Sequence, residues 1–351
     1  MNYLTIVILI FAVIGGIDRI FGNRLGIGKE FEKAFMLLGV MALSMIGMIV
    51  ISPLIADLLV PVSKFVSEIL HIDPSIIPAS LFANDMGGAP LANEMAVNSE
   101  IGAFNAMVLS SMLGCTISFT IPFALGVVPN EHHSDLLFGL LCGIVTIPLG
   151  LLVSGIIVGI SFKLLIINLI PIIIFSGIIA VGLLLFPDTC VKIFNVFGVI
   201  IKIIVTVGLV LGIINFLSGK GIIKGIATFE EGAYICFNAA VVLSGTFPFM
   251  FILSKVLKKP LLFIGKKTGL NSESVLGIFS SLATSATAFG MMDKMNKKGI
   301  VLNSAFAVSG AFTVGSHLAF TMAFDNAYIL PVIVGKLVAG VTALIVASLV
   351  F

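Results

Sequence analysis

The chain has 351 residues, of which 59% are hydrophobic and only 10% are charged, and its formal net charge is +2. Soluble domains carry about 25% charged residues, so this composition excludes a water-soluble globule and indicates a protein embedded in a lipid bilayer. The small net charge gives no support for a nucleic-acid partner. The four cysteines fall in or beside apolar segments at no metal-ligand spacing, so we expect free thiols and no bound metal.

Nine apolar segments are long enough to cross a hydrocarbon core about 30 Å thick at a rise of about 1.5 Å per residue. In chain order they are 3–20, 31–58, 101–127, 135–160, 163–185, 191–217, 231–256, 299–325 and 328–350. No hydrophilic interval between them is long enough to form a separate soluble domain.

Two further segments are less apolar and are rich in Gly, Ser, Thr, Asn and Pro. The first polar segment covers 74–97 and the second polar segment covers 272–295. Each follows a short amphipathic piece (60–71 and 261–270) and directly precedes an apolar span. Irregular backbone at membrane depth is tolerated only inside protein or beside a water-filled cavity. We therefore expect both segments to be re-entrant hairpins that form a substrate site near the midplane.

The order of element types is the same over 1–160 and 188–351, with 161–187 left as a linker helix between them. Local similarity supports this pairing, because the run Ser80–Ala83 in the first polar segment resembles Ser280–Ala283 in the second. If both segments are hairpins, an odd number of crossings separates the repeats, which inverts the second one in the membrane. The sequence thus predicts an all-α integral membrane protein with nine transmembrane helices plus two re-entrant hairpins, arranged as two inverted repeats.

Lysine and arginine residues decide the orientation through the positive-inside rule. With hairpins and an outside N-terminus, the basic stretches 19–33, 255–267 and 294–298 all face the cytoplasm. If the polar segments crossed the membrane instead, 255–267 would face outside while 19–33 stayed inside. We therefore expect hairpins, an outside N-terminus and a cytoplasmic C-terminus.

The first polar segment carries a carboxylate at its centre. Gly87 and Gly88 permit a tight reversal, and Pro90 can begin the returning helix. Asp85 lies at the tip, and a carboxylate inside a membrane is costly and usually functional. Asp85 and Asn84 are therefore candidates for binding a cationic or hydroxylated solute, the alternative being that Asp85 only caps the returning helix. Glu94, two to three turns further on, is a weaker candidate nearer the interface.

The second polar segment has hydroxyl groups and no charge between residues 280 and 290. Thr284, Ser285 and Thr287 are candidates for hydroxyls that face the solute. The alternative is that they pack against a neighbour or bond to their own backbone.

The span 299–325 has one polar face, because Asn303, Gly310, His317 and Thr321 fall on a single helical stripe. Asn303 and His317 are candidate site residues, and Asn105 has a similar place in the span 101–127. His317 either takes part in proton movement or is a structural hydrogen-bonding residue. No nucleotide-binding, nucleophile-elbow or zinc-protease motif is present, so we expect neither a cofactor nor an enzyme.

The run Asp85-Met86-Gly87-Gly88-Ala89-Pro90-Leu91-Ala92 resembles a motif of the ethanolamine utilisation transporters, which are bacterial inner-membrane proteins. The resemblance extends over the whole chain and implies ethanolamine as the substrate. A member of that family has an aromatic residue in place of Ala89, so this position cannot supply a ring here. An aromatic contact to the ammonium group would have to come from phenylalanine, and Phe82 and Phe289 near the two tips are the candidates.

Three other readings of the sequence stay open. One is a carrier of another small amine or a nucleoside-like solute. A membrane enzyme would need a second carboxylate or a histidine close to Asp85, and the sequence shows no such motif. A sensor would usually carry a cytoplasmic output domain, and we expect none here. The sequence also leaves open whether the protein is a monomer or a homodimer.

Overall fold

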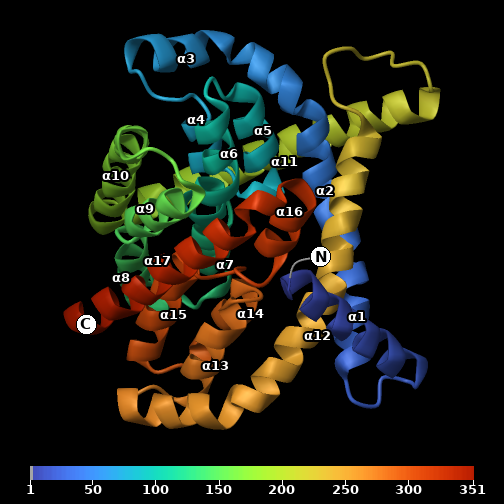
Figure 1. Cartoon of the computed structure of the whole chain (residues 1–351). Helices are drawn as coiled ribbons and strands as arrows, with labels where there is room; N and C mark the ends of the chain where they lie inside the picture. Colours follow the sequence, from blue (N-terminus) through green and yellow to red (C-terminus); the bar gives the residue numbers. More distant parts are fainter. Residues whose placement is uncertain (1–2) are drawn as a thin grey trace.

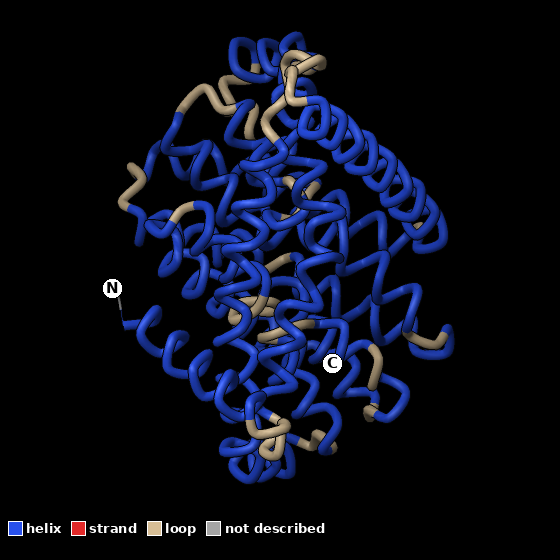
Figure 2. Tube along the Cα trace, turned by 90° about the vertical axis from the view of Figure 1, so that its right-hand side faces the viewer, coloured by secondary structure: helices blue, strands red, loops and turns tan. Residues whose placement is uncertain are grey.

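The computed structural model describes residues 3–351, so the first two residues of the first predicted repeat lie outside it. Every regular element in that range is helical, and short connections join the helices (Figure 2). Eight helices in the described range are long and apolar enough to cross a membrane: Tyr3–Ile20, Ile27–Leu58, Ser99–Val127, Asn130–Val158, Phe162–Leu185, Pro187–Ser218, Phe229–Thr268 and Asn326–Val350. The chain is therefore a multi-pass membrane protein.

Four long helices pack together and are called the long-helix group: α1 (Tyr3–Ile20), α2 (Ile27–Leu58), α11 (Pro187–Ser218) and α12 (Phe229–Thr268). Helix α2 packs along the other three (Figure 1). The backbones of α2 and α11 come so close that a Cβ on Gly47 would lie 1.9 Å from the Val205 carbonyl oxygen. Small residues allow this approach, which gives membrane helices close van der Waals contact.

A second set of helices, called the inner group, packs around the span 99–127. It consists of α8 (His133–Ile144), α9 (Ile147–Val158), α10 (Phe162–Leu185), α15 (Lys297–Ser309) and α17 (Ile329–Val350). Helix α15 packs on α8 and α17, and α17 packs on α9. The span itself is one helix built from α6 (Ser99–Phe104), the π-helical turns η3 (Asn105–Gly114) and η4 (Thr116–Thr120), and α7 (Ile121–Val127). It is the most deeply buried of the long apolar helices.

Both polar segments are pairs of short helices joined by a turn. The first contains α4 (Ile76–Leu81), the 3-10 turn η2 (Asn84–Met86) and α5 (Gly88–Met95). The second contains α13 (Ser272–Ser281), α14 (Ser285–Phe289) and η6 (Met292–Lys294). In each segment the two helices pack against each other, and each is far too short to cross a core of about 30 Å.

The two polar segments lie toward opposite ends of the molecule. In Figure 1, α4 and α5 are in the upper half and α13 and α14 in the lower half. The amphipathic pieces follow the same division. Helix α3 (Val60–Lys64) with η1 (Phe65–Ile69) forms an arm at the upper end, while the last part of α12, beyond Pro260, runs across the lower end (Figure 1).

The prediction of one continuous helix over 299–325 is wrong. Helix α15 ends at Ser309 and α16 (Ser316–Phe324) begins after a turn over 310–315, in which Phe312 has a φ of 61°. The Phe312 and Val314 amides donate to the carbonyl oxygens of Ser281 (2.9 Å) and Leu282 (2.8 Å). The second polar segment thus accepts the hydrogen bonds that the broken helix gives up. Hydropathy could not show the break, because the residues in the turn are as apolar as those of a helix.

Candidate functional site

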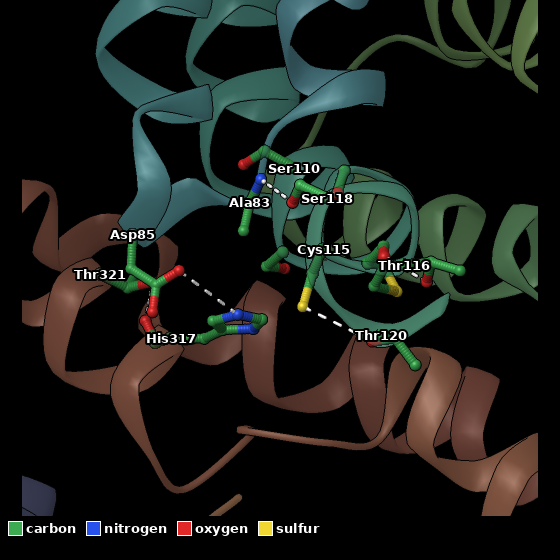
Figure 3. Close-up of polar contacts among 12 residues, drawn as sticks. Ala83, Asp85, Ser110, Cys115, Thr116, Ser118, Thr120, His317 and Thr321 are labelled. Atoms are coloured by element: carbon green, nitrogen blue, oxygen red, sulfur yellow. Dashed lines mark hydrogen bonds and ion pairs between the residues drawn. The ribbon is translucent and has the colours of Figure 1, made fainter. Parts of the chain in front are cut away.

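The tip of the first polar segment has a closely defined backbone. Gly87 has a φ of 98°, in the left-handed region that favours glycine. A Cβ on Gly88 would lie 2.2 Å from the Phe82 carbonyl oxygen. The Ala83 amide donates to Ser118 Oγ at 3.0 Å, which ties the tip to the span 99–127 (Figure 3). These constraints hold Asp85 in one place between α4 and α5.

Asp85 faces the first turn of α16. Its Oδ1 lies 3.7 Å from His317 Nε2 (Figure 3), a distance too long for a hydrogen bond. The Ser316 side chain hydrogen-bonds the Asp85 carboxyl group. The break in the helix over 310–315 is what allows Ser316 and His317 to begin a new helix beside this carboxylate.

His317 is almost completely enclosed. Its side chain is 2% exposed, against 15% for that of Asp85. Its Nδ1 has no hydrogen-bond partner among the described residues, and its ring packs on that of Phe312 with centroids 5.0 Å apart. The imidazole therefore presents one nitrogen to Asp85 and keeps the other unpaired.

Lys336 is a buried charged residue that the sequence reading missed. It lies about two turns into α17, is 1% exposed, and its Nζ donates to the Ser111 carbonyl oxygen at 2.6 Å. It is close enough to interact electrostatically with Asp85, His317 and Cys115. The available signal was a single lysine inside an otherwise apolar span, where charged residues are usually functional.

A cavity of about 260 Å³ lies at Asp85, between the long-helix group and the tips of the two polar segments. From the long-helix group, α2 contributes Met41 and Ser44, and α12 contributes Phe247. The first polar segment contributes Asp85 and the second contributes Thr284. The cavity is slightly smaller than the range of about 300–1,000 Å³ typical of drug-sized ligands, so it suits a small solute. Its lining is mainly apolar, with one carboxylate.

Comparison with known proteins places the chain in a family. The family model described as ethanolamine utilisation protein EutH matches residues 1–350. The chain belongs to the EutH family. A relative from Listeria monocytogenes, named probable ethanolamine permease EutH, is 43% identical over 338 residues, which cover 96% of this chain and 91% of the relative. This confirms the resemblance first seen at Asp85–Ala92.

More distant relatives match over a similar extent. A protein from Escherichia coli, also named probable ethanolamine permease EutH, is 35% identical over 382 aligned positions, covering 98% of this chain and 93% of the relative. The uncharacterized protein YxeR of Bacillus subtilis is 35% identical over 333 residues, covering 95% and 90%. No solved structure matches the chain.

In this EutH-family chain, the other predicted residues near the tips of the two polar segments differ in how far their side chains are exposed. Asn84 is fully buried beside Asp85, and neither its Nδ2 nor its Oδ1 has a partner among the described residues. Ser285 is also buried, with an unpaired Oγ. Thr287 and Glu94 are exposed, and neither lines the cavity. Of the predicted residues, the structure thus brings Asp85, Thr284 and His317 together around the cavity.

Asn105 and Asn303 lie away from the cavity and hold the beginnings of the polar segments. Asn105 Nδ2 donates to Ser75 Oγ at 2.9 Å, and its Oδ1 accepts from Asn168 at 2.8 Å. Asn303 Nδ2 donates to the Ser274 carbonyl oxygen at 2.9 Å. In each half, an asparagine in the helix after the polar segment therefore bonds to a serine at its start.

The aromatic residues that line the cavity are Phe119, Phe247 and Phe312. The two predicted phenylalanines pack elsewhere. The ring centroid of Phe82 lies 5.6 Å from that of Phe197, and the ring centroid of Phe289 lies 6.2 Å from that of Phe123. The sequence reading chose the phenylalanines nearest the tips in the chain. That choice could not find Phe247, because this residue comes from α12, which is far from the first tip in the sequence.

Proposed function

We propose that this protein transports ethanolamine across the bacterial cytoplasmic membrane and binds it in the cavity at Asp85. The observation that carries the proposal is a single carboxylate in a small, mainly apolar cavity inside a multi-pass membrane protein. The names of two relatives support it, since both are named probable ethanolamine permease.

The chemistry of the cavity suits the two ends of the substrate. Ethanolamine is mostly an ammonium ion at neutral pH, and a cation in a low-dielectric site needs a counter-charge. Asp85 supplies that charge. The hydroxyl of ethanolamine can exchange hydrogen bonds with Thr284 or Ser316, which line the same cavity. The rings of Phe119, Phe247 and Phe312 offer faces to the ammonium group.

The proposal includes an architecture of two inverted repeats, 1–160 and 188–351, joined by the helix within 161–187. The placement of the two polar segments toward opposite ends of the molecule (Figure 1) supports it. So do the matching bonds from Asn105 to Ser75 and from Asn303 to Ser274. On this architecture both polar segments are re-entrant, the N-terminus is outside, and the C-terminus is cytoplasmic.

The position of the cavity suggests how access alternates. One wall belongs to the long-helix group, and the other belongs to the polar segments and their neighbours. A movement of the polar segments with the inner group against the long-helix group would carry Asp85 from one side of the membrane toward the other. Close glycine contacts such as that of Gly47 with Val205 keep the long-helix group rigid during this movement.

Uptake of labelled ethanolamine into liposomes that contain the purified protein tests the proposal. We expect saturable uptake, and we expect Asp85→Asn to lower it about 100-fold or more while Glu94→Gln, a change at an exposed carboxylate, leaves it unchanged. Unchanged uptake by Asp85→Asn would remove Asp85 from the site. Absence of uptake by the wild type, or stronger competition from a larger amine than from unlabelled ethanolamine, would contradict the assigned substrate.

A further inference from the structure

We propose that Lys336 gives up a proton when ethanolamine binds, so that the substrate's ammonium group enters the site in exchange for the Lys336 proton. This inference rests on the proposed function and adds that ethanolamine binding is coupled to the release of a proton. It starts from the position of Lys336, which is fully buried in α17 yet close enough to interact with the carboxylate of Asp85.

The charged groups around Lys336 are few. Asp85 from the first polar segment, His317 from α16 and the Cys115 thiol from the span 99–127 interact with it electrostatically. Lys336 is the sole titratable residue of α17, and α9, which packs on α17, has none. In the other elements that pack on α17, the titratable residues are His133, Asp135 and Cys142 of α8, Lys297 and Lys298 of α15, and Tyr328 of the 3-10 turn η7 (Asn326–Tyr328), none of which adds to its electrostatic environment.

Asp85 is thus the one carboxylate among the described residues that balances Lys336. In the empty carrier, a protonated Lys336 and an ionised Asp85 together are neutral. An ethanolammonium ion in the cavity would leave two cations for one carboxylate, and an uncompensated charge in a low-dielectric interior is very costly. Loss of one proton restores neutrality.

The exchange balances in atoms and charge. A proton leaves Lys336 Nζ and passes to water, the lysine becomes a neutral amine, and the ammonium group of the substrate becomes the partner of Asp85. The neutral amine still has N–H groups to donate, so its bond to the Ser111 carbonyl oxygen survives. Binding therefore does not require the contact between α17 and the span 99–127 to break.

Lys336 suits this role better than His317. A protonated imidazole has two N–H donors, and Nδ1 of His317 has no acceptor among the described residues. A charged His317 would leave a buried donor unsatisfied, whereas neutral His317 leaves only an unused acceptor. The geometry thus favours a histidine that stays neutral and a lysine that exchanges the proton.

Calorimetric titration of the purified, full-length protein with ethanolamine tests the proposal. Titrations at one pH in buffers with different heats of protonation give the number of protons released per substrate bound. For the wild type we expect release of about one proton per substrate bound. The apparent Kd should fall about tenfold for each unit by which the pH is raised, as long as Lys336 is protonated in the empty carrier. For Lys336→Met we expect no release and a Kd independent of pH, while the exposed Lys163→Met behaves as the wild type.

Two further variants keep the test decisive if Lys336→Met does not fold. Lys336→Arg keeps a permanent positive charge, because a guanidinium does not lose its proton in proteins. It should fold, release no proton and bind ethanolamine about 100-fold more weakly. His317→Gln should still release about one proton.

The results that overturn the proposal are distinct from failure of the proposed function. Proton release that persists in Lys336→Met would mean that another group, or ethanolamine itself, loses the proton. Binding by the wild type without proton release, wild-type affinity in Lys336→Arg, or loss of release in His317→Gln alone would also overturn it. Absence of any ethanolamine binding to the wild type would instead contradict the proposed function.

Discussion

The two polar segments each contain two short helices that pack together but contribute different chemistry. The first carries Asp85 at its tip and is followed by the unbroken helix 99–127. The second contributes the uncharged Thr284 to the cavity, and the helix after it is broken over 310–315. The break positions Ser316 and His317 beside Asp85. One half thus supplies the carboxylate and the other supplies the groups that face it.

The difference shows how a polar segment can be held in two ways. The first is tied by a side chain, since Ser118 Oγ accepts from the Ala83 amide. The second is tied by backbone, since the amides of Phe312 and Val314 donate to the carbonyls of Ser281 and Leu282. In both halves a glycine allows the close approach: Gly114 lies against Phe82, and Gly315 lies against Ala283.

The largest effect is expected from removing the negative charge of Asp85, which distinguishes the first polar segment from the second. Asp85→Asn should lower ethanolamine uptake about 100-fold or more, because the substrate cation loses its buried partner. Initial uptake rates in liposomes measure this, with Glu94→Gln as the control. A loss of less than threefold would mean that the carboxylate does not bind the cation.

The two glycine contacts can be broken separately. A Cβ at position 114 would lie 2.0 Å from the Phe82 carbonyl oxygen, and one at position 315 would lie 2.1 Å from that of Ala283. Gly114→Ala and Gly315→Ala should each lower the free energy of unfolding by about 1–3 kcal/mol, the usual cost of overpacking.

Thermal unfolding in detergent measures this loss. Gly16→Ala is the matched control, because nothing lies within 4 Å of a Cβ there, and alanine in a helix is more favourable than glycine by about 1 kcal/mol. Equal stability of Gly315→Ala and Gly16→Ala would show that the break in the second half is not closely packed on Ala283.

The hydroxyl from the broken helix can be compared with the hydroxyl from the unbroken one. Ser316→Ala removes a hydrogen bond to a charged group and should lower uptake about tenfold. Ser118→Ala removes a bond to an amide and should cost about 1 kcal/mol of stability, with a smaller effect on uptake. Uptake kinetics together with unfolding curves separate the two, and the reverse order of effects on uptake would contradict the assigned roles.

The smallest effect is expected within the second polar segment. Thr284→Val removes a hydroxyl that lines the cavity and should lower uptake by about threefold to tenfold. Thr287→Val removes an exposed hydroxyl and should change stability by no more than about 0.5 kcal/mol and leave uptake unaltered. A larger loss of uptake in Thr287→Val than in Thr284→Val would place the substrate on the other face of α14.

The sequence by itself determined the class of the protein and identified Asp85 as a candidate binding residue. Low charge and long apolar runs leave no alternative to a helical membrane protein, because backbone groups in lipid must be satisfied internally. Asp85 could be found because a carboxylate within an apolar, glycine-rich stretch is costly unless it has a function.

Only the tertiary structure decided which groups meet Asp85. The break over 310–315 depends on backbone hydrogen bonds to a segment about 30 residues earlier in the chain, and such partners leave no local pattern. The lining rings of Phe119, Phe247 and Phe312 come from three separate places in the chain: the π-helical turn η4, helix α12 and the turn over 310–315. Lys336 is one residue in an apolar span, and only the packing of α17 on the span 99–127 brings its charge close to Asp85. Hydropathy and periodicity describe each helix by itself, whereas the site is formed where helices distant in the sequence come together.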